Sequence, residues 1–166
     1  MNDDKEIRFI DSGYGELFRI PDGGSIVLTH ADGEESVAEC KHLGQTHVSI
    51  GGTCWHICQF AEMVERNGAT VRPEGEPETN CGYRIIRRAP AGDKVFKLGH
   101  DPNAAQEYAT WQGYRDSPGR YYRGHFWNDR AIAERDLLHR ANAERNGTPY
   151  DHTRLMKQQN KRDCAR

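Results

Sequence analysis

The sequence predicts an α+β protein made of two small subdomains, each a short antiparallel sheet packed by one main helix. Three observations predict this class. Short stretches alternate apolar and polar residues, glycine-rich turns separate them, and two longer segments repeat apolar residues every three or four positions. At 166 residues the chain is long enough for one ordinary domain or for two small ones.

Five short strands are expected in the first fifty residues, where they would form an antiparallel meander. They are "EIRFI", "ELFRI", "SIVLTH", "SVAECKHL" and "THVSI". Turn sequences such as "DSGYG" and "PDGGS" separate them, and the Asp-Gly and Gly-Gly pairs supply the positive φ that tight turns need.

A helix over residues 54–67 is expected to follow the meander and to complete a first subdomain of residues 1–71. Its apolar positions are spaced as one face of a helix: Ile57, Phe60, Ala61 and Val64. Thr53 is suitably placed as the N-cap, and Asn67-Gly68 would end the helix.

Two cysteines near the start of this helix, Cys54 and Cys58, invite a metal or redox interpretation. Helical geometry would place His56 about 200° around from Cys54, so one ion could not easily bind all three side chains. The spacing also differs from the C-x₂-C of zinc and redox sites. We therefore expect core packing and neither metal nor cofactor. A zinc-stabilised interaction module, completed by residues such as Cys40 or Cys81, stays an alternative.

Residues 72–80, "RPEGEPETN", are expected to form an exposed linker because they combine prolines, glutamates and a glycine. The net charge changes sign there. Residues 1–78 hold 15 acidic and 6 basic side chains, a net of −9, and residues 79–166 hold 10 and 17, a net of +7. Either the two halves attract one another, or they present two binding surfaces of opposite sign.

The second subdomain, residues 81–166, is expected to contain basic strands, one long helix and a polar tail. "CGYRIIRRA" and "KVFKLGH" would form a hairpin around "PAGD", followed by a short helical turn near residue 101 and a strand in "YATWQGY". The long helix would span 128–146, capped by Asn128 or Asp129 and ended by Asn146-Gly147. The tail can hold a short helix over 151–159.

No catalytic motif is present in the sequence. It contains no phosphate-binding loop, dinucleotide fingerprint or nucleophile elbow, and its eight histidines are dispersed. We therefore expect no catalytic residues and a protein that is not an enzyme. Without a secretory signal or an apolar run of about 20 residues, and with an odd count of five cysteines, it is expected in a cytoplasm.

Two sets of residues are candidates for partner binding. Segment 113–130 interleaves arginines with aromatic side chains, which suits nucleic acid or a protein interface, although some rings could instead anchor the long helix in the core. With "YRIIRR" it supplies the basic and aromatic set: Arg84, Arg87, Arg88, Arg115, Arg120, Tyr121, Tyr122 and Arg123. The acidic set is Asp22, Asp32, Glu34, Glu35 and Glu39.

Three segments carry a resemblance: "FIDSGYGELFRIPDGGSIVL", "HVSIGGTCWHICQFAEM" and "YATWQGY…GHFWNDRAIAERDLLHRA". They resemble small accessory proteins on mobile elements of anaerobic bacteria, among which anti-CRISPR inhibitors are a recurring class. The resemblance implies a bacterial cytoplasmic inhibitor that occludes a host CRISPR effector nuclease with its guide RNA, with DNA or RNA contact also expected. It assigns no role to individual residues. The alternative is a nucleic-acid-binding regulatory protein of the mobile element itself.

Overall fold

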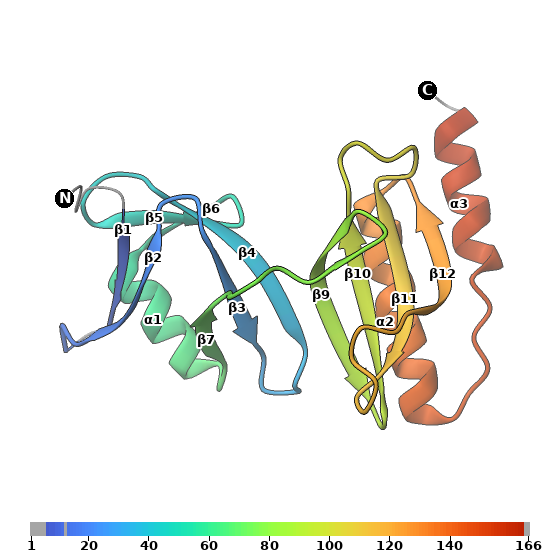
Figure 1. The fold of residues 1–166 in the computed structure, drawn as a ribbon, viewed down its shortest axis with the longest axis horizontal. Helices are drawn as coiled ribbons and strands as arrows, with labels where there is room; N and C mark the ends of the chain where they lie inside the picture. Colours follow the sequence, from blue (N-terminus) through green and yellow to red (C-terminus); the bar gives the residue numbers. More distant parts are fainter. Residues whose placement is uncertain (1–5, 12, 165–166) are drawn as a thin grey trace. The chain divides into compact units, whose positions relative to one another are not determined.

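The computed structural model describes residues 6–11 and 13–164, the last three by their backbone alone, and the chain divides into two compact units. Unit 1 is Met1–Glu76 and unit 2 is Pro77–Arg166 (Figure 1). The fold is α+β, as the sequence predicts, and its strands pair antiparallel. The division lies inside the predicted linker, but strands occupy both ends of that segment.

Unit 1 contains a two-stranded hairpin, five further strands and one helix. In chain order they are β1 (Glu6–Ile10), β2 (Glu16–Pro21), β3 (Ser25–Thr29), β4 (Glu35–His42), β5 (His47–Ile50), β6 (Thr53–His56), α1 (Ile57–Arg66) and β7 (Thr70–Pro73). β1 pairs with β2, whereas β3 pairs with β4 and β7, and β5 pairs with β4 and β6. All five predicted strands are present; β6 and β7 were not predicted.

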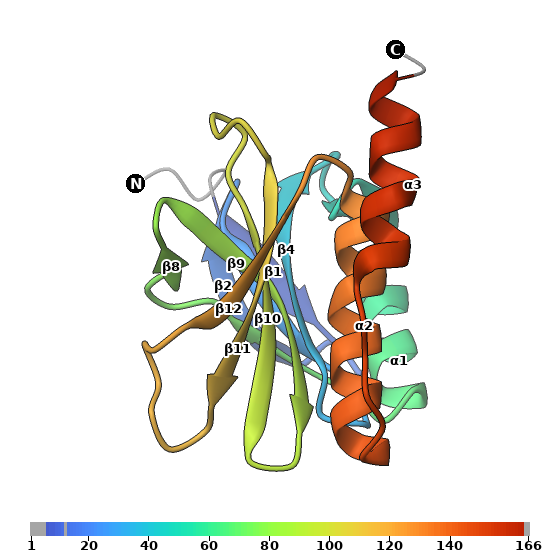
Figure 2. The same ribbon diagram turned by 90° about the vertical axis from the view of Figure 1, so that its right-hand side faces the viewer.

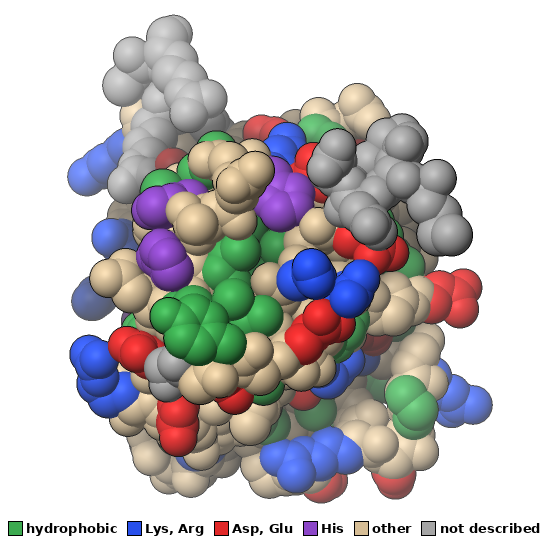
Figure 3. Space-filling view, turned by 90° about the vertical axis from the view of Figure 1, so that its left-hand side faces the viewer, with side chains coloured by type: hydrophobic (Ala, Val, Ile, Leu, Met, Phe, Trp, Pro, Cys, Tyr) green, Lys and Arg blue, Asp and Glu red, His purple; other side chains and the backbone are tan. Residues whose placement is uncertain are grey.

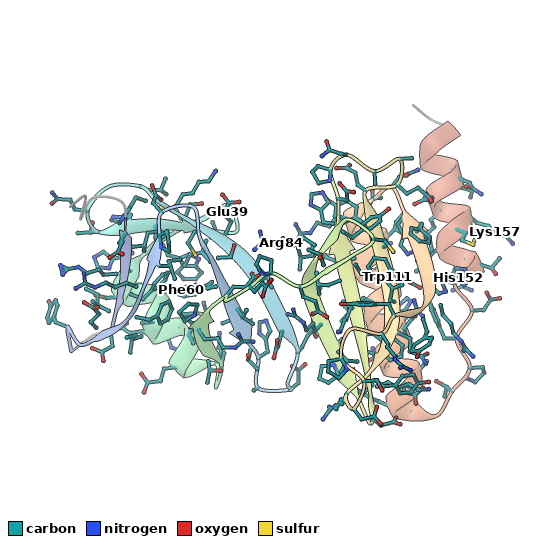
Figure 4. All side chains as sticks on the ribbon, in the orientation of Figure 1. Glu39, Phe60, Arg84, Trp111, His152 and Lys157 are labelled. Carbon is teal, nitrogen blue, oxygen red and sulfur yellow. The ribbon has the colours of Figure 1, made fainter. Side chains whose placement is uncertain are left out.

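The core of unit 1 forms where one face of α1 meets the strands. Ile57, Phe60 and Val64 are buried, as their spacing predicts. Phe60, labelled in Figure 4, meets the ring of Phe9 on β1 edge-on with 6.1 Å between centroids. Burying side chains of this size contributes about 1.5–3 kcal/mol each, so this face is what holds the helix in place.

The start of α1 corrects the sequence prediction. The helix begins at Ile57, and its N-cap is His56, whose Nδ1 accepts a hydrogen bond from the Cys58 backbone N–H at 3.2 Å. Thr53 is not the N-cap, because residues 53–56 pair with β5 as a strand. Cys54 is consequently exposed and does not pack in the core, and Cys58 is only half-buried.

Unit 2 contains a five-stranded antiparallel sheet and two helices. They are β8 (Thr79–Asn80), β9 (Tyr83–Ala91), β10 (Lys94–His100), β11 (Tyr108–Tyr114), β12 (Tyr122–Trp127), α2 (Arg130–Asn146) and α3 (Thr153–Cys164). The order within the unit is β12-β11-β10-β9, with β8 paired to β9. Both helices lie on the same side of the sheet (Figure 2). β8 and β12 were not predicted, and the expected helical turn near residue 101 is not helical.

The ends of α2 follow the prediction closely. Asp129 is the N-cap and accepts a hydrogen bond from the Ile132 backbone N–H at 3.1 Å, and Gly147 ends the helix in the left-handed conformation with φ 63°. α2 packs Ala133, Leu137 and Ala141 against the sheet, where Leu155 of α3 joins the same core. In the described part of the chain, none of the helices has the length and apolar character needed to cross a membrane.

Candidate functional site: the β12 surface and the histidine pocket of unit 2

Trp111 organises the face of the unit 2 sheet opposite α2. A Cβ added at Gly99 or Gly124 would come within 2.8 or 2.9 Å of the Trp111 side chain, so both positions require glycine for this close approach. The rings of Tyr83 and Tyr121 meet Trp111 edge-on at 5.5 and 5.8 Å. Figure 4 labels Trp111 on β11. This packing fixes the chain where the 115–121 loop enters β12.

A charged network around Glu78 fastens the same loop. The Glu78 carboxylate accepts hydrogen bonds from Arg88 at 2.7 Å, from Lys97 at 2.5 Å and from the Tyr121 hydroxyl at 2.5 Å. Burial raises the pKa of Glu78, but these three donors outweigh it and lower the pKa to about 2. Burial and the same hydrogen bond raise the pKa of Tyr121. Tyr121 therefore holds the 115–121 loop to the sheet, and its hydroxyl is already used within unit 2.

The arginines of β9 take part in similar internal contacts. Arg88 is held by Glu78, and Arg87 lies 3.9 Å from Glu134 of α2. Arg84, labelled in Figure 4, is half-buried on the same strand. The structure therefore does not present "YRIIRR" as a free basic patch.

The remaining predicted basic and aromatic residues follow one another along the 115–121 loop and β12, with Tyr122 beside Tyr114 on one face of the sheet and Phe126 beside Trp111 on the other. We name them, with Phe126, the β12 surface: Arg115, Arg120, Tyr122, Arg123 and Phe126. All five are exposed, Tyr122 by 42% and Phe126 by 45%. None of the three arginines forms an ion pair with a carboxylate in the described residues. β12 is an edge strand of the unit 2 sheet. It pairs with β11 on one side, and its other side has no partner strand among the described residues.

A β-bulge shapes the β12 surface. Thr110 pairs with His125 and Gln112 pairs with Tyr122, so Arg123 and Gly124 together oppose the single residue Trp111. Arg123 has a φ of 53°, which is uncommon for a residue other than glycine. Bulges re-aim side chains, and here the bulge places an arginine between the exposed surface and a pocket beneath it.

The predicted acidic residues of unit 1 do not gather into one patch. Asp22 accepts a hydrogen bond from the His42 backbone N–H before β3, whereas Asp32 accepts one from the Glu34 backbone N–H after β3. Glu34 is buried. The other two contact basic side chains: Glu35 lies 3.6 Å from Arg72, and Glu39 lies 3.3 Å from Lys41. The face of unit 1 in Figure 3 likewise mixes both signs of charge.

Asp136 is the centre of a second network, which the sequence analysis did not identify. Its side chain is fully buried on α2 and accepts hydrogen bonds from the Thr110 hydroxyl, from His125 Nδ1 at 2.8 Å and from the Tyr150 hydroxyl at 2.6 Å. Burial raises the pKa of Asp136, yet His125, Thr110 and Tyr150 together bring it below its usual value. The residue is therefore an ionised, fully hydrogen-bonded carboxylate.

Arg140 lies one helical turn from Asp136 and completes this network. One terminal nitrogen is 3.9 Å from the Asp136 carboxylate and donates to the Thr110 hydroxyl at 3.1 Å, and the other donates to the Arg123 carbonyl at 2.9 Å. The side chain is only 6% exposed. Arg140 thereby connects α2 with β11 and β12 and holds the bulge of β12.

Two histidines lie next to this network. His125 and His152 stack with 3.8 Å between ring centroids and an angle of 13° between ring planes. Figure 4 labels His152, in the segment between α2 and α3. An ionised carboxylate only accepts, so His125 Nδ1 carries a proton toward Asp136 and Nε2 is the ring's other polar atom. Burial, then the neighbouring His125, lower the pKa of His152.

Both imidazoles line a pocket of about 210 Å³, which we name the histidine pocket. Gln112, Arg123 and Arg140 also line it, so its polar groups are hydrogen-bond donors and cations. Glu144, the carboxylate on its wall, is paired with Lys94 at 2.9 Å. A site of this kind is suited to hold an anionic group.

The helical pattern of α2 contained a signal for this site. At about 100° per residue, Asp136 and Arg140 fall between Ile132 and Leu137, inside the buried face. The prediction of this helix from the sequence did not use that charged pair. A buried charge on a helix needs partners, so its position would have predicted a polar network.

Within the described residues, no group of three or more His, Cys, Asp and Glu side chains is placed to hold a metal ion. Cys54 lies on β6 and Cys58 on α1, and the zinc-stabilised alternative stays a prediction. Comparison with protein-family models, curated proteins and solved structures finds no match for this chain. The resemblance to anti-CRISPR inhibitors therefore stays a prediction.

Proposed function

We propose that this protein is a non-enzymatic binding protein of the bacterial cytoplasm whose unit 2 binds single-stranded nucleic acid. One observation carries the proposal: three arginines without an acidic partner in the described residues and two aromatic rings are all exposed within the 13 residues of the 115–121 loop and β12. Arginine neutralises phosphate, and aromatic rings stack on unpaired bases.

The charge of the two units supports this assignment. Unit 2 holds 17 basic and 11 acidic side chains, a net of +6, whereas unit 1 holds 6 and 14, a net of −8. Three acidic side chains of unit 2, Glu78, Glu134 and Glu144, form ion pairs with basic residues of β9 and β10. Residues 115–127 hold three arginines and one aspartate, a net of +2, so phosphate groups would be attracted there.

A single strand suits the geometry better than a duplex. The exposed rings of Tyr122 and Phe126 can stack only on bases that are not already stacked and paired in a helix. Arg115 and Arg120 on the loop and Arg123 on the edge strand could contact successive phosphates of one backbone. The partner class is therefore single-stranded DNA or RNA, read by backbone charge and stacking.

The experiment is fluorescence anisotropy with labelled single strands of about 20 nucleotides, titrated at several salt concentrations. The Arg120→Gln/Arg123→Gln double variant should bind about tenfold more weakly. Its log–log salt slope should fall by about 1.4, which is two phosphate contacts on a single strand. Arg66→Gln, an exposed arginine of unit 1, is the charge-matched control. Equal affinities and slopes for all variants, or no binding at micromolar concentration, would refute the proposal.

The second candidate function is inhibition of a guide-RNA-bound CRISPR effector nuclease. The observation that favours it is the opposite net charge of the two units, since an acidic unit could compete for a basic DNA channel. Glu35 contacts Arg72 and Glu39 contacts Lys41, so part of the acidic charge is already neutralised within unit 1. Inhibition therefore ranks below single-strand binding as a candidate function. A DNA-cleavage assay with purified effector tests it: micromolar protein should abolish cleavage, and full cleavage would exclude it.

A further inference from the structure

The stacked histidines separate the histidine pocket from a second pocket in unit 2. The second has about 260 Å³ and lies along β12 and α3, and we name it the aromatic pocket. Its walls include Gln106, Phe126, Trp127 and Met156, with His125 and His152 shared between the two pockets. Each pocket alone is smaller than a usual small-molecule site of about 300–1,000 Å³, and the two together fall within that range.

The histidine pocket provides the chemistry of a phosphate site. Arg140 is buried and fixed by its bonds to Thr110 and to the Arg123 carbonyl, so its guanidinium is held in place before any ligand arrives. Arg123 contributes a second, exposed guanidinium at the rim. Guanidinium groups form strong charge-assisted hydrogen bonds with phosphate oxygens, and Gln112 adds an amide donor.

The aromatic pocket provides the chemistry of a base site. Trp127 is 1% exposed, and its Nε1–H has no hydrogen-bond partner in the described residues. A buried donor without a partner is unfavourable and calls for a physical explanation. Phe126, which lines the same pocket, is 45% exposed and offers a ring for stacking. Every nucleobase has a flat face for such a ring and an acceptor for such a donor.

We infer that these two pockets bind one phosphorylated nucleotide, with its phosphate in the histidine pocket and its base in the aromatic pocket. The inference rests on the proposed function and deepens it, since the β12 surface leads from the pockets along the path of a strand. The same chemistry is presented by a free nucleoside monophosphate and by the phosphorylated end of a strand. The stacked histidines would lie against the sugar, between the two pockets.

The test uses the full chain and follows the tryptophan indole N–H signals by ¹H–¹⁵N NMR. Only three tryptophans are present, and the Trp127→Phe variant identifies the signal of Trp127. The probes are adenosine monophosphate, adenosine, inorganic phosphate, and one oligonucleotide with a 5′-phosphate, a 3′-phosphate or neither. The proposal expects the monophosphate to shift the Trp127 signal and inorganic phosphate to leave it unchanged.

Two variants test the site. His152→Gln should weaken binding of the monophosphate about fivefold, the loss of about one neutral hydrogen bond from the ring between the two pockets. Trp127→Phe should weaken it about fivefold but leave the binding of inorganic phosphate unaltered. Arg66→Gln in unit 1 is the control and should change neither. Thermal unfolding shows whether each variant is folded, and His152→Gln, which replaces a partly exposed ring, keeps the test decisive should Trp127→Phe unfold.

The outcomes separate this inference from the proposed function. Equal binding of the free monophosphate and the phosphorylated oligonucleotide identifies a nucleotide site, whereas tighter binding of a phosphorylated end than of an unphosphorylated end identifies a strand-end site. Binding of long single strands without any response of Trp127 to phosphorylated probes overturns the inference and leaves the proposed function standing. A Trp127 shift with the monophosphate, but no salt-dependent strand binding, supports a nucleotide site and refutes the proposed single-strand binding.

Discussion

Two carboxylates of unit 2, Glu78 and Asp136, each collect three donors, and they do so on opposite faces of one sheet. Glu78 is held by two basic side chains, Arg88 and Lys97, and by the Tyr121 hydroxyl. Asp136 is held by two hydroxyls, from Thr110 and Tyr150, and by the His125 imidazole. The first network fastens a loop, and the second positions an imidazole at a pocket.

The largest effect is expected from Asp136→Asn. The asparagine amide would place a donor among three donors and leave Arg140 buried without its counter-charge. Breaking a buried pair of this kind costs about 3–5 kcal/mol of unfolding free energy. Urea denaturation followed by tryptophan fluorescence measures the change, with the exposed Asp93→Asn as control. A loss below about 1 kcal/mol would mean that Asp136 does not organise unit 2.

Glu78→Gln is expected to have a smaller effect, about 2 kcal/mol, because the site is half-buried and glutamine can still accept from Tyr121. The folded-state pKa of about 2 lies below the ordinary 4.5, so the wild-type advantage is complete above pH 4.5 and disappears as the pH falls toward 2. Denaturation at several pH values measures it, with exposed Glu76→Gln as control. An advantage independent of pH would contradict this account.

His152 should produce a weaker pH dependence of the same sign, nearer neutrality. Its pKa is lower in the folded protein than the ordinary 6.5, so the unfolded chain takes up a proton first. The unfolding free energy should therefore fall as the pH drops below 6.5, and His152→Gln should remove that part of the decrease. Thermal unfolding between about pH 5 and pH 8, the range in which histidine side chains titrate, measures it. The same slope in wild type and variant would show that His152 does not contribute.

The smallest effects are expected for the cysteines. Their reactivity should distinguish a buried thiol from exposed ones, and no change in stability is involved. Burial, with the nearby charge of Glu39, raises the pKa of Cys40 to about 12, so little thiolate forms at neutral pH. Cys54 and Cys81 are exposed. Iodoacetamide followed by mass spectrometry should label Cys54 and Cys81 before Cys40 in the native protein. Labelling of Cys40 at the same rate would contradict its place in the core.

The sequence predicted those elements whose signals are local. Alternating residues and Asp-Gly or Gly-Gly pairs located the five strands of the meander, and Asp129 with Gly147 marked both ends of α2. It failed where pairing with a distant strand decided the structure. Residues 53–56 are a strand because they pair with β5, and residues 122–127 are a strand because they pair with β11, despite the glycine and polar residues among them.

The candidate site was predictable only in part, for a similar reason. Arg115, Arg120, Tyr122 and Arg123 were found because they are neighbours in the sequence. Their separation from Arg87 and Arg88 depends on Glu134 and Glu78, which come from other elements. Asp136, His125 and His152 are brought together only by packing of α2 and the segment after it against the sheet. No local pattern contains that information.

The most direct test of the β12 surface is backbone ¹H–¹⁵N NMR of the whole chain titrated with a short single-stranded oligonucleotide. The proposed function predicts that the largest shifts fall on the 115–121 loop and β12, including Tyr122, Arg123 and Phe126, while β9 and unit 1 change little. Shifts centred on Arg84–Arg88 or on the acidic residues of unit 1, with β12 unaffected, would contradict it.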